Sequence, residues 1–166
     1  MNDIKKVFLD TSFFIRLLNP KEADHQNALT YFRRFTKDKV ELCLSAIVVA
    51  EFGIKGNITH FPYPYLQLVP FNFDHAKLTS TFARTAYEAR KKGVLEVGKR
   101  VVIPNDTKLM AQAEKEGADL FIGRDSNFKS VHKFLKENNL VSYNYLDLRT
   151  PPNEFYGELD LKIPEE

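Results

Sequence analysis

A single cysteine, four scattered histidines and the lack of any long apolar run limit what this sequence can be. One cysteine, Cys43, excludes an intramolecular disulfide framework. No apolar run approaches the roughly 20 residues that a helix needs to span a bilayer, and the N-terminus lacks the long apolar segment of a secretory signal. We therefore expect a cytoplasmic protein without membrane contact. The histidines show no metal-ligand spacing, which argues against a zinc site.

The net charge of +2 says little about partners, but the charges are unevenly distributed. Six basic residues between positions 84 and 100 stand against two glutamates, whereas residues 151–166 are acidic with one lysine. A solvated helix face is the ordinary explanation for such a basic stretch. Contact with a phosphate backbone is the alternative. The basic residues are Arg84, Arg90, Lys91, Lys92, Lys99 and Arg100.

The hydrophobic pattern predicts a single domain in which strands alternate with helices. Several of the expected strands are continuous apolar runs, which is typical of a parallel sheet covered on both faces. The expected fold class is therefore a three-layer α/β/α domain with a mostly parallel central sheet. Pro151 and Pro152 mark its expected end, giving a domain at 1–150 and an acidic tail at 151–166. The expected strands are 4–9, 40–44, 66–71, 119–122 and 140–145; the expected helices are 12–18, 22–37, 46–54, 74–92, 105–116 and 127–137.

Four carboxylates stand where α/β sheets place their sites, beyond the carboxyl ends of the strands. Asp10 directly follows the first strand, and Asp125 follows the strand at 119–122. Asp106 lies at the start of an expected helix, and Glu51 lies within the apolar segment AIVVAEF. Each has a structural explanation by itself, because aspartates often cap helices and a buried glutamate can pair with an arginine.

Taken together, the four carboxylates favour a cation site. Three or four carboxylates within a few Å cannot all ionise unless a cation neutralises them. Oxygen ligands without histidine or cysteine suit Mg²⁺ or Mn²⁺ rather than Zn²⁺. An ion held there against phosphate oxygens can lower the pKa of a bound water and stabilise an in-line displacement.

Three segments resemble the successive acidic motifs of PIN-domain nucleases, particularly the VapC-type toxins of toxin–antitoxin pairs. They are VFLDTSFFIRLL, LSAIVVAEF and IPNDTKLMAQAEKEGADLFIGRDSNF. The similarity runs in order from about residue 4 to residue 145. The last segment, with its Ala-rich helix and following strand, is the most specific part.

The resemblance implies a metal-binding and catalytic quartet of Asp10, Glu51, Asp106 and Asp125. It also matches Ser12 to a small polar residue that supports the first aspartate, with Thr11 beside it.

Two positions depart from the family pattern. Asn127 stands where many relatives have a further acid, so a second metal is weaker or absent here. Gly123 stands where relatives often have threonine, which removes a hydroxyl that could orient Asp125 or contact substrate.

The function implied is that of a Mg²⁺- or Mn²⁺-dependent endoribonuclease. Asp10, Asp106 and Asp125 would hold one ion, and Glu51 would ligate it through water, assist a second ion or act as general base. A metal-activated water would hydrolyse the RNA phosphodiester without a covalent enzyme intermediate. The basic stretch and Arg124 become candidate RNA-backbone contacts, although Arg124 could instead neutralise the acidic cluster. The resemblance also implies a cognate antitoxin and often a homodimer.

Two rival functions stay open. The first is a PIN-like RNA- or protein-binding module with weak or no nuclease activity, favoured by Gly123 and Asn127. The second is a phosphate-ester hydrolase acting on another substrate, since other α/β folds use strand-end aspartates around Mg²⁺. Some of those enzymes need a second aspartate two residues after the first, where this chain has Ser12.

Overall fold

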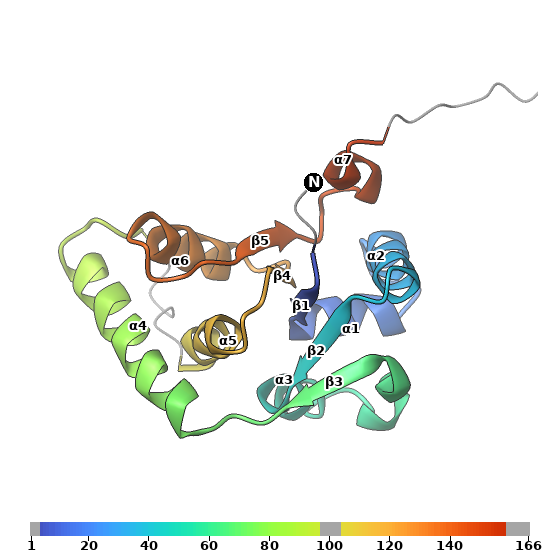
Figure 1. Cartoon of the computed structure of the whole chain (residues 1–166), viewed down its shortest axis with the longest axis horizontal. Coiled ribbons are helices and arrows are strands. Elements are labelled where there is room, and N and C mark those ends of the chain that lie inside the picture. Colours follow the sequence, from blue (N-terminus) through green and yellow to red (C-terminus); the bar gives the residue numbers. More distant parts are fainter. Residues whose placement is uncertain (1–3, 97–103, 159–166) are drawn as a thin grey trace, which may run out of the picture.

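Five parallel strands form one sheet in the order β3-β2-β1-β4-β5 (Figure 1). The computed structural model describes residues 4–96 and 104–158. Within these ranges the predicted parallel α/β architecture is confirmed, and every strand pair is parallel. The strands are β1 (Lys6–Leu9), β2 (Glu41–Ser45), β3 (Leu66–Val69), β4 (Leu120–Gly123) and β5 (Asn144–Asp147).

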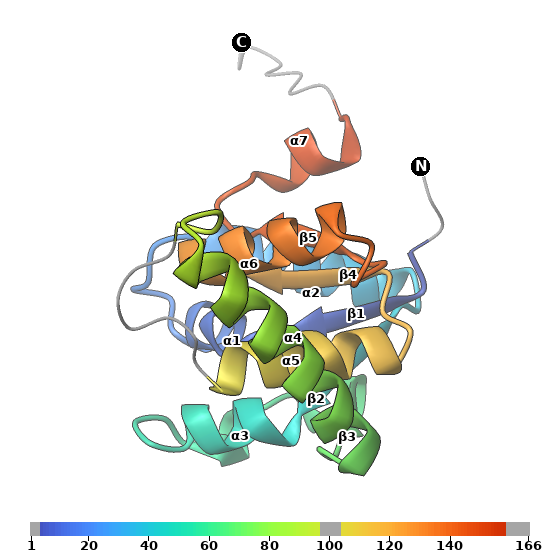
Figure 2. The same ribbon diagram turned by 90° about the vertical axis from the view of Figure 1, so that its left-hand side faces the viewer.

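Helices cover both faces of the sheet, which gives the expected three layers (Figures 1 and 2). Helices α1 and α2 lie on one face and α4, α5 and α6 on the other, while α3 packs against α1. None of the described helices is both long and apolar enough to span a bilayer. The helices are α1 (Thr11–Leu18), α2 (His25–Lys37), α3 (Ala46–Phe52), α4 (Phe73–Lys91), α5 (Pro104–Lys115), α6 (Ser126–Glu137) and α7 (Pro152–Tyr156), with 3-10 turns η1 (Ile58–His60) and η2 (Tyr63–Tyr65).

The three central strands are buried because both of their faces are covered. Val7, Phe8 and Leu9 of β1 are at most 1% exposed, and all four residues of β4 are buried. Such strands consist of apolar residues throughout, so they need no alternation of polar and apolar side chains. The edge strands β3 and β5 are only partly buried. The burial of these apolar residues therefore holds in place the strands whose ends form the carboxyl edge of the sheet.

Local boundaries differ from the predicted ones in three informative places. Helix α1 is capped by Asp10 rather than by Ser12, and the segment predicted as a loop after α3 contains the turns η1 and η2. The last strand begins at Asn144 instead of residue 140, because the apolar residues Leu140 and Val141 pack in the connection that precedes it.

The segment after Pro151 contains a short helix that packs against α2. In α7, the Phe155 ring meets the Tyr31 ring edge-on at 5.9 Å. Arg34 of α2 lies over the Tyr156 ring at 4.7 Å and pairs with Glu158 at 3.0 Å. The predicted boundary at residue 150 stays a prediction, and residues 159–166 of the predicted tail lie outside the described residues.

Candidate functional site

The carboxyl ends of the central strands bring the predicted acids to one edge of the sheet. Leu9 pairs in register with Ile122, and the Asp10 amide donates to the Ile122 carbonyl over 3.0 Å. Asp10 therefore lies beside the end of β4, and Asp125 follows that strand two residues after Gly123. Glu51 belongs to α3, which begins directly after β2. Parallel strands thus gather residues that are far apart in the sequence.

Asp10 has a structural role as well as a candidate chemical one. Its Oδ2 accepts hydrogen bonds from the Ser12 hydroxyl at 2.7 Å and the Ser12 amide at 3.3 Å, which caps α1. The Ser12 hydroxyl also accepts from the Arg124 amide at 3.0 Å. Ser12 therefore joins the cap of α1 to the loop that carries Asp125.

Glu51 is held at both carboxylate oxygens. The Thr11 hydroxyl donates to Oε2, and the Asn105 side-chain amide donates to Oε1 over 2.9 Å. Among the described residues these two donors, and not an arginine, satisfy the carboxylate on the apolar helix α3. Asn105 was not among the predicted site residues; its place directly before Asp106 at the start of a helix was the available signal.

Asp125 caps helix α6. Its Oδ1 accepts from the backbone amides of Asn127 and Phe128, each at 2.8 Å. Asn127, which is also predicted to support the site, contacts this carboxylate through its backbone amide, and this contact does not depend on its side chain. A capping carboxylate at a helix N-terminus also benefits from the helix dipole.

Asp106 is electrostatically linked to the other three acids. Burial is the main cause that raises the pKa of Asp106 to about 7, and the charges of Asp125, Asp10 and Glu51 raise it further. Burial also raises the pKa of Asp10, against the opposing effect of the Ser12 hydrogen bonds. We refer to Asp10, Glu51, Asp106 and Asp125 as the acidic site.

The donor set of the acidic site fits a hard divalent cation. All its donors are carboxylate oxygens, and a cation would relieve the mutual repulsion that raises the pKa of Asp106. Within the described residues, no three His, Cys, Asp or Glu side chains are grouped closely enough to hold an ion as they stand. Ion binding would therefore require the carboxylates to approach one another.

Tyr145 of β5 is a member of this region that the sequence reasoning missed. A Cβ atom built on Gly123 would lie 3.2 Å from the Tyr145 hydroxyl and 3.2 Å from Asp10 Oδ2. Burial, followed by the charges of Asp10, Asp147 and Asp125, raises the pKa of Tyr145. The phenol therefore stays protonated and is a hydrogen-bond donor beside the acidic site.

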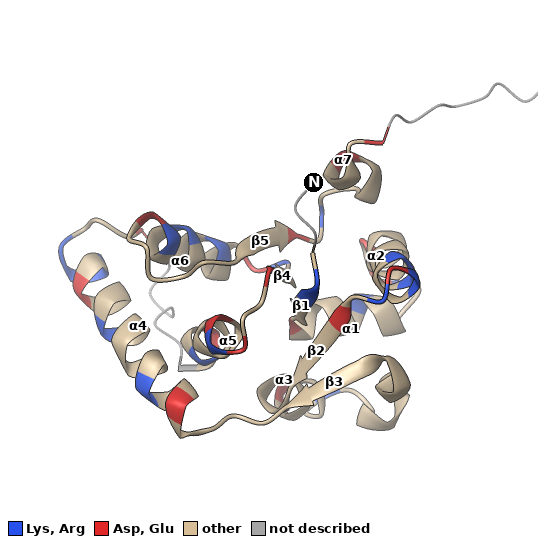
Figure 3. Ribbon diagram, in the orientation of Figure 1, with Lys and Arg blue, Asp and Glu red and all other residues tan. Residues whose placement is uncertain are grey.

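The predicted RNA-contact residues that the structure describes lie on α4, directly after it, and in the loop between β4 and α6. Arg84, Lys91 and Lys92 are exposed on α4 or directly after it, and Arg90 is half-buried. Figure 3 shows basic residues spread along this helix. The Arg124 guanidinium pairs with Asp24 at 2.8 Å rather than with an acid of the predicted quartet. Lys99 and Arg100 lie outside the described residues.

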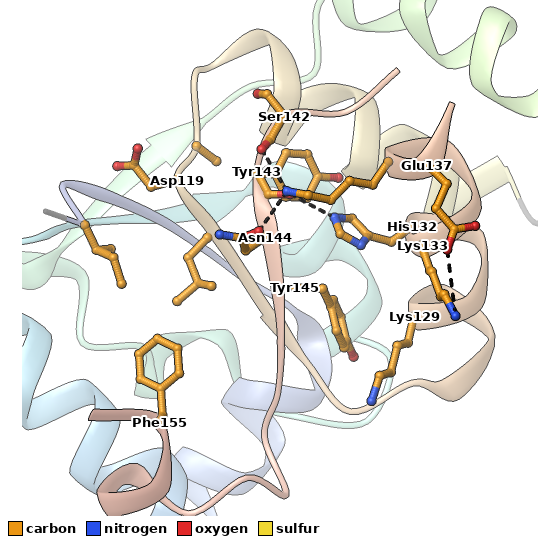
Figure 4. A pocket seen from close by; sticks show the side chains of 14 residues that line it. Asp119, Lys129, His132, Lys133, Glu137, Ser142, Tyr143, Asn144, Tyr145 and Phe155 are labelled. Atoms are coloured by element: carbon orange, nitrogen blue, oxygen red, sulfur yellow. Dashed lines mark hydrogen bonds and ion pairs between the residues drawn. The ribbon is translucent and has the colours of Figure 1, made fainter. Parts of the chain in front are cut away.

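Two grooves lie at opposite ends of the strands. The larger, of about 1020 Å³, runs between β5 and α6 and is lined by Tyr145 but by none of the four acids (Figure 4). The smaller, of about 450 Å³, is lined by Thr11 and Glu51 together with apolar side chains of α1 and α3. The smaller groove therefore opens directly beside the acidic site.

Comparison with solved structures identifies the same architecture in two VapBC assemblies. One is VapBC2 from Rickettsia felis bound to a DNA fragment from their promoter, with a TM-score of 0.52 and 17% identity. The match covers 86% of this chain and 98% of that one. The other is DNA-bound VapBC from Salmonella typhimurium, with a TM-score of 0.51, 19% identity and coverage of 87% and 99%.

No curated protein matches the sequence. The family model of the PIN domain matches residues 7–133, which include all four acids of the acidic site. That range also contains β2, β3, β4 and all of β1 except Lys6. The chain therefore belongs to the PIN domain family.

Proposed function

We propose that this chain is a Mg²⁺- or Mn²⁺-dependent endoribonuclease and the toxin of a toxin–antitoxin pair. One observation carries the proposal: four acids from separate segments lie at one edge of the sheet, close enough for the charges of three of them to add to burial in raising the pKa of the half-buried Asp106 carboxyl to about 7. Carboxylates kept in mutual repulsion are what a divalent cation neutralises. Membership of the PIN domain family agrees with this chemistry.

In the proposed site, Asp10, Asp106 and Asp125 hold the ion. When bound, Mg²⁺ or Mn²⁺ would polarise the phosphate and lower the pKa of a bound water. The hydrogen bonds of Ser12 fix the orientation of Asp10, and the cap of α6 fixes that of Asp125. These hydrogen bonds order each carboxylate by itself, so ion binding would need the ligands to approach one another but not to be ordered one by one.

Glu51 is the residue we propose as an outer ligand or general base. Thr11 and Asn105 orient its two oxygens, so the carboxylate points in a fixed direction. A base must lie within hydrogen-bond reach of the proton that it accepts, either directly or through one water. Removing either donor would leave Glu51 in place but free to rotate.

Incubation of the purified chain with total RNA and Mg²⁺ or Mn²⁺ tests the proposed reaction. We expect metal-dependent cleavage at defined positions by the wild type and none by Asp10→Asn. Asp119→Asn is the matched control, because Asp119 accepts from the Lys5 and Lys6 amides at the opposite end of β1. Equal cleavage by wild type and Asp10→Asn would contradict the proposal.

The rival function is RNA binding without cleavage. The lack of a preassembled group of three ligands among the described side chains favours this rival. Calorimetric titration with Mn²⁺ separates the two functions, because a nuclease of the proposed kind must bind the ion and Asp10→Asn must weaken that binding. RNA binding with no Mn²⁺ uptake by the wild type would establish the binding module.

A partner antitoxin is the second part of the proposal. Both compared structures are VapBC assemblies, and the smaller groove has the properties of a peptide-binding surface beside Glu51. Ile15 and Ile54, which line it, are 38% and 78% exposed. An apolar segment seated there would cover one side of the acidic site.

Co-expression with the product of the adjacent gene tests for this partner. We expect a stable complex that does not cleave RNA, and we expect Ile54→Asp to weaken the complex without affecting cleavage by the chain alone. A complex that forms equally well with Ile54→Asp would place the partner elsewhere. The homodimer stays a prediction, which sedimentation of the free chain would test.

A further inference from the structure

The Tyr145 hydroxyl and the Asp10 carboxylate both lie close to the position that a side chain on Gly123 would occupy. A Cβ on Gly123 would meet the Tyr145 hydroxyl at 3.2 Å, Asp10 Oδ2 at 3.2 Å and Asp10 Cβ at 3.3 Å. These distances are shorter than ordinary van der Waals contact, so a side chain at this position would displace one of its neighbours. The phenol and the carboxylate thus share the space beside Gly123.

Aromatic packing holds the Tyr145 ring in this position. Tyr145 pairs in register with Phe121, and their rings stack at 6.3 Å with an interplanar angle of 16°. The Phe128 ring of α6 stacks on Tyr145 at 5.6 Å and 30°. Figure 4 shows the tyrosine between β5 and the helix that carries His132. Because the ring is fixed on two sides, its hydroxyl has a defined place.

The hydroxyl also contacts the main chain of a second acid. Tyr145 donates to the Asp125 carbonyl over 3.4 Å, a long hydrogen bond that links β5 to the cap of α6. On its other side, the hydroxyl approaches the space next to the Asp10 carboxylate. One phenol therefore lies between two acids that come from different strands.

We propose that Tyr145 is a positioning residue of the acidic site and that its hydroxyl takes the place of the side chain that Gly123 lacks. The hydroxyl keeps the backbone of Asp125 in position and limits the movement of the Asp10 carboxylate. The expected effect of Tyr145 on cleavage rests on the proposed nuclease function. Its effect on the positions of Asp10 and Asp125 does not, because it can be measured in the metal-free chain.

Tyr145→Phe tests the role of the hydroxyl alone. We expect Mn²⁺ affinity to fall about 10-fold and kcat to fall by about 10- to 100-fold, with an unchanged KM for RNA. Tyr143→Phe is the matched control, because this neighbour in the same segment donates its hydroxyl to the Met110 carbonyl at 3.2 Å, in the core. We expect the control to bind Mn²⁺ and cleave as the wild type does.

Moving the hydroxyl from position 145 to position 123 distinguishes a positioning role of the hydroxyl from a general effect on the stability of the fold. Gly123→Thr alone should weaken Mn²⁺ binding, because the new side chain crowds Asp10. The double variant Gly123→Thr, Tyr145→Phe should recover most of the affinity, because the phenyl ring leaves room and threonine restores a hydroxyl. A double variant no better than Gly123→Thr, or a Tyr145→Phe variant that binds and cleaves normally, would overturn the proposal.

The metal-free chain provides a readout that does not depend on nuclease activity. Tyr145→Phe should shift the ¹³C resonances of the Asp125 carbonyl and the Asp10 carboxyl, whereas Tyr143→Phe should leave both unchanged. Unshifted resonances would overturn the positioning role. Another outcome is that the wild type fails to bind Mn²⁺ and to cleave RNA while Tyr145→Phe still shifts both resonances. That result would support the positioning role of Tyr145 and contradict only the proposed nuclease function.

Discussion

At the scale of single residues, the fold holds the four acids in different ways. Asp10 and Asp125 cap helices, whereas Glu51 depends on Thr11 and Asn105 for its orientation. Burial and the neighbouring charges oppose the ionisation of Asp106, and burial opposes that of Asp10 as well. Unlike the other three acids, Asp106 accepts no hydrogen bond that would offset this effect among the causes of its pKa shift.

The raised pKa of Asp106 predicts a pH-dependent loss of stability in the metal-free chain. Between about pH 4 and about pH 7 the folded state keeps a proton that the unfolded state has released, so stability falls as pH rises through this window. Each unit of pKa difference corresponds to about 1.4 kcal/mol. Urea unfolding in a chelator at pH 5 and pH 8 should show a loss for the wild type that exceeds that of Asp106→Asn.

Two further results would follow at pH 8. Asp106→Asn should be more stable than the wild type without metal, because the amide carries no charge to bury. Mn²⁺ should stabilise the wild type and have little effect on the variant. Parallel stability profiles for the two proteins at all pH values would contradict the assigned role of Asp106.

At the scale of elements, α4 is attached to the domain through an unusual cap. His75 Nδ1 accepts from the Asn72 amide at 3.0 Å while Asn72 Oδ1 accepts from the His75 amide at 3.0 Å. Because Nδ1 is an acceptor, Nε2 carries the proton and donates to Glu116 at 2.9 Å. One buried imidazole therefore closes the first turn of α4 and links it to the end of α5.

Replacing this imidazole should destabilise the chain. We expect His75→Ala to lower the free energy of unfolding by about 1–2 kcal/mol, the usual cost of a lost helix cap, with a further contribution from the cavity. The exposed His60 provides the control variant His60→Ala, which should change stability by less than about 0.5 kcal/mol. Urea unfolding measures both, and equal stabilities would show that the cap is dispensable.

The elements also show how far the sequence alone predicts this structure. The apolar runs of β1, β2 and β4 predict buried parallel strands, and Ser45 caps α3 as expected. Asp10 and Ser12 are both residue types that cap helices and both lie at the start of α1, and the structure shows that Asp10 is the cap. Local pattern cannot choose between such neighbours when both have suitable side chains.

The contacts across the sheet are the part that the sequence does not predict. A tyrosine in a strand is normally a core residue, and nothing near Tyr145 in the sequence indicates a contact with Gly123 or Asp10. Its place depends on the register between β4 and β5. Asn105 could have been found from its position next to Asp106, whereas Tyr145 required the fold.

At the scale of the whole molecule, the two ends of helix α4 lie differently relative to the carboxyl edge of the sheet. The strands point to the acidic edge, and Figure 2 shows the C-terminal end of α4 on the same side of the molecule as the arrowheads of β1 and β4. Lys91 and Lys92 are exposed at that end of the helix, whereas Lys77 lies near its start and pairs with Asp74 at 2.7 Å. The same helix therefore carries basic residues on the side of the acidic edge, at its C-terminal end, and a basic residue at its other end.

This arrangement predicts position-dependent RNA binding. In the presence of Ca²⁺ or a chelator to suppress cleavage, Lys91→Ala with Lys92→Ala should weaken binding and reduce the slope of log K against log salt by about 0.7 for each lost phosphate contact. Lys77→Ala is the matched control on the same helix and should leave the slope unchanged. Equal slopes for all three proteins would remove this end of α4 from the RNA-binding surface.

The caps at Asp10 and Asp125 have a practical consequence for capturing a complex. Asparagine caps a helix about as well as aspartate does, so Asp10→Asn and Asp125→Asn should remove charge from the edge of the sheet while α1 and α6 keep their first turns. Alanine would remove both features at once and confuse loss of chemistry with loss of structure. On the proposed function, the asparagine variants would lose RNA cleavage without losing the fold. They would therefore be suitable for capturing an uncleaved RNA in a complex.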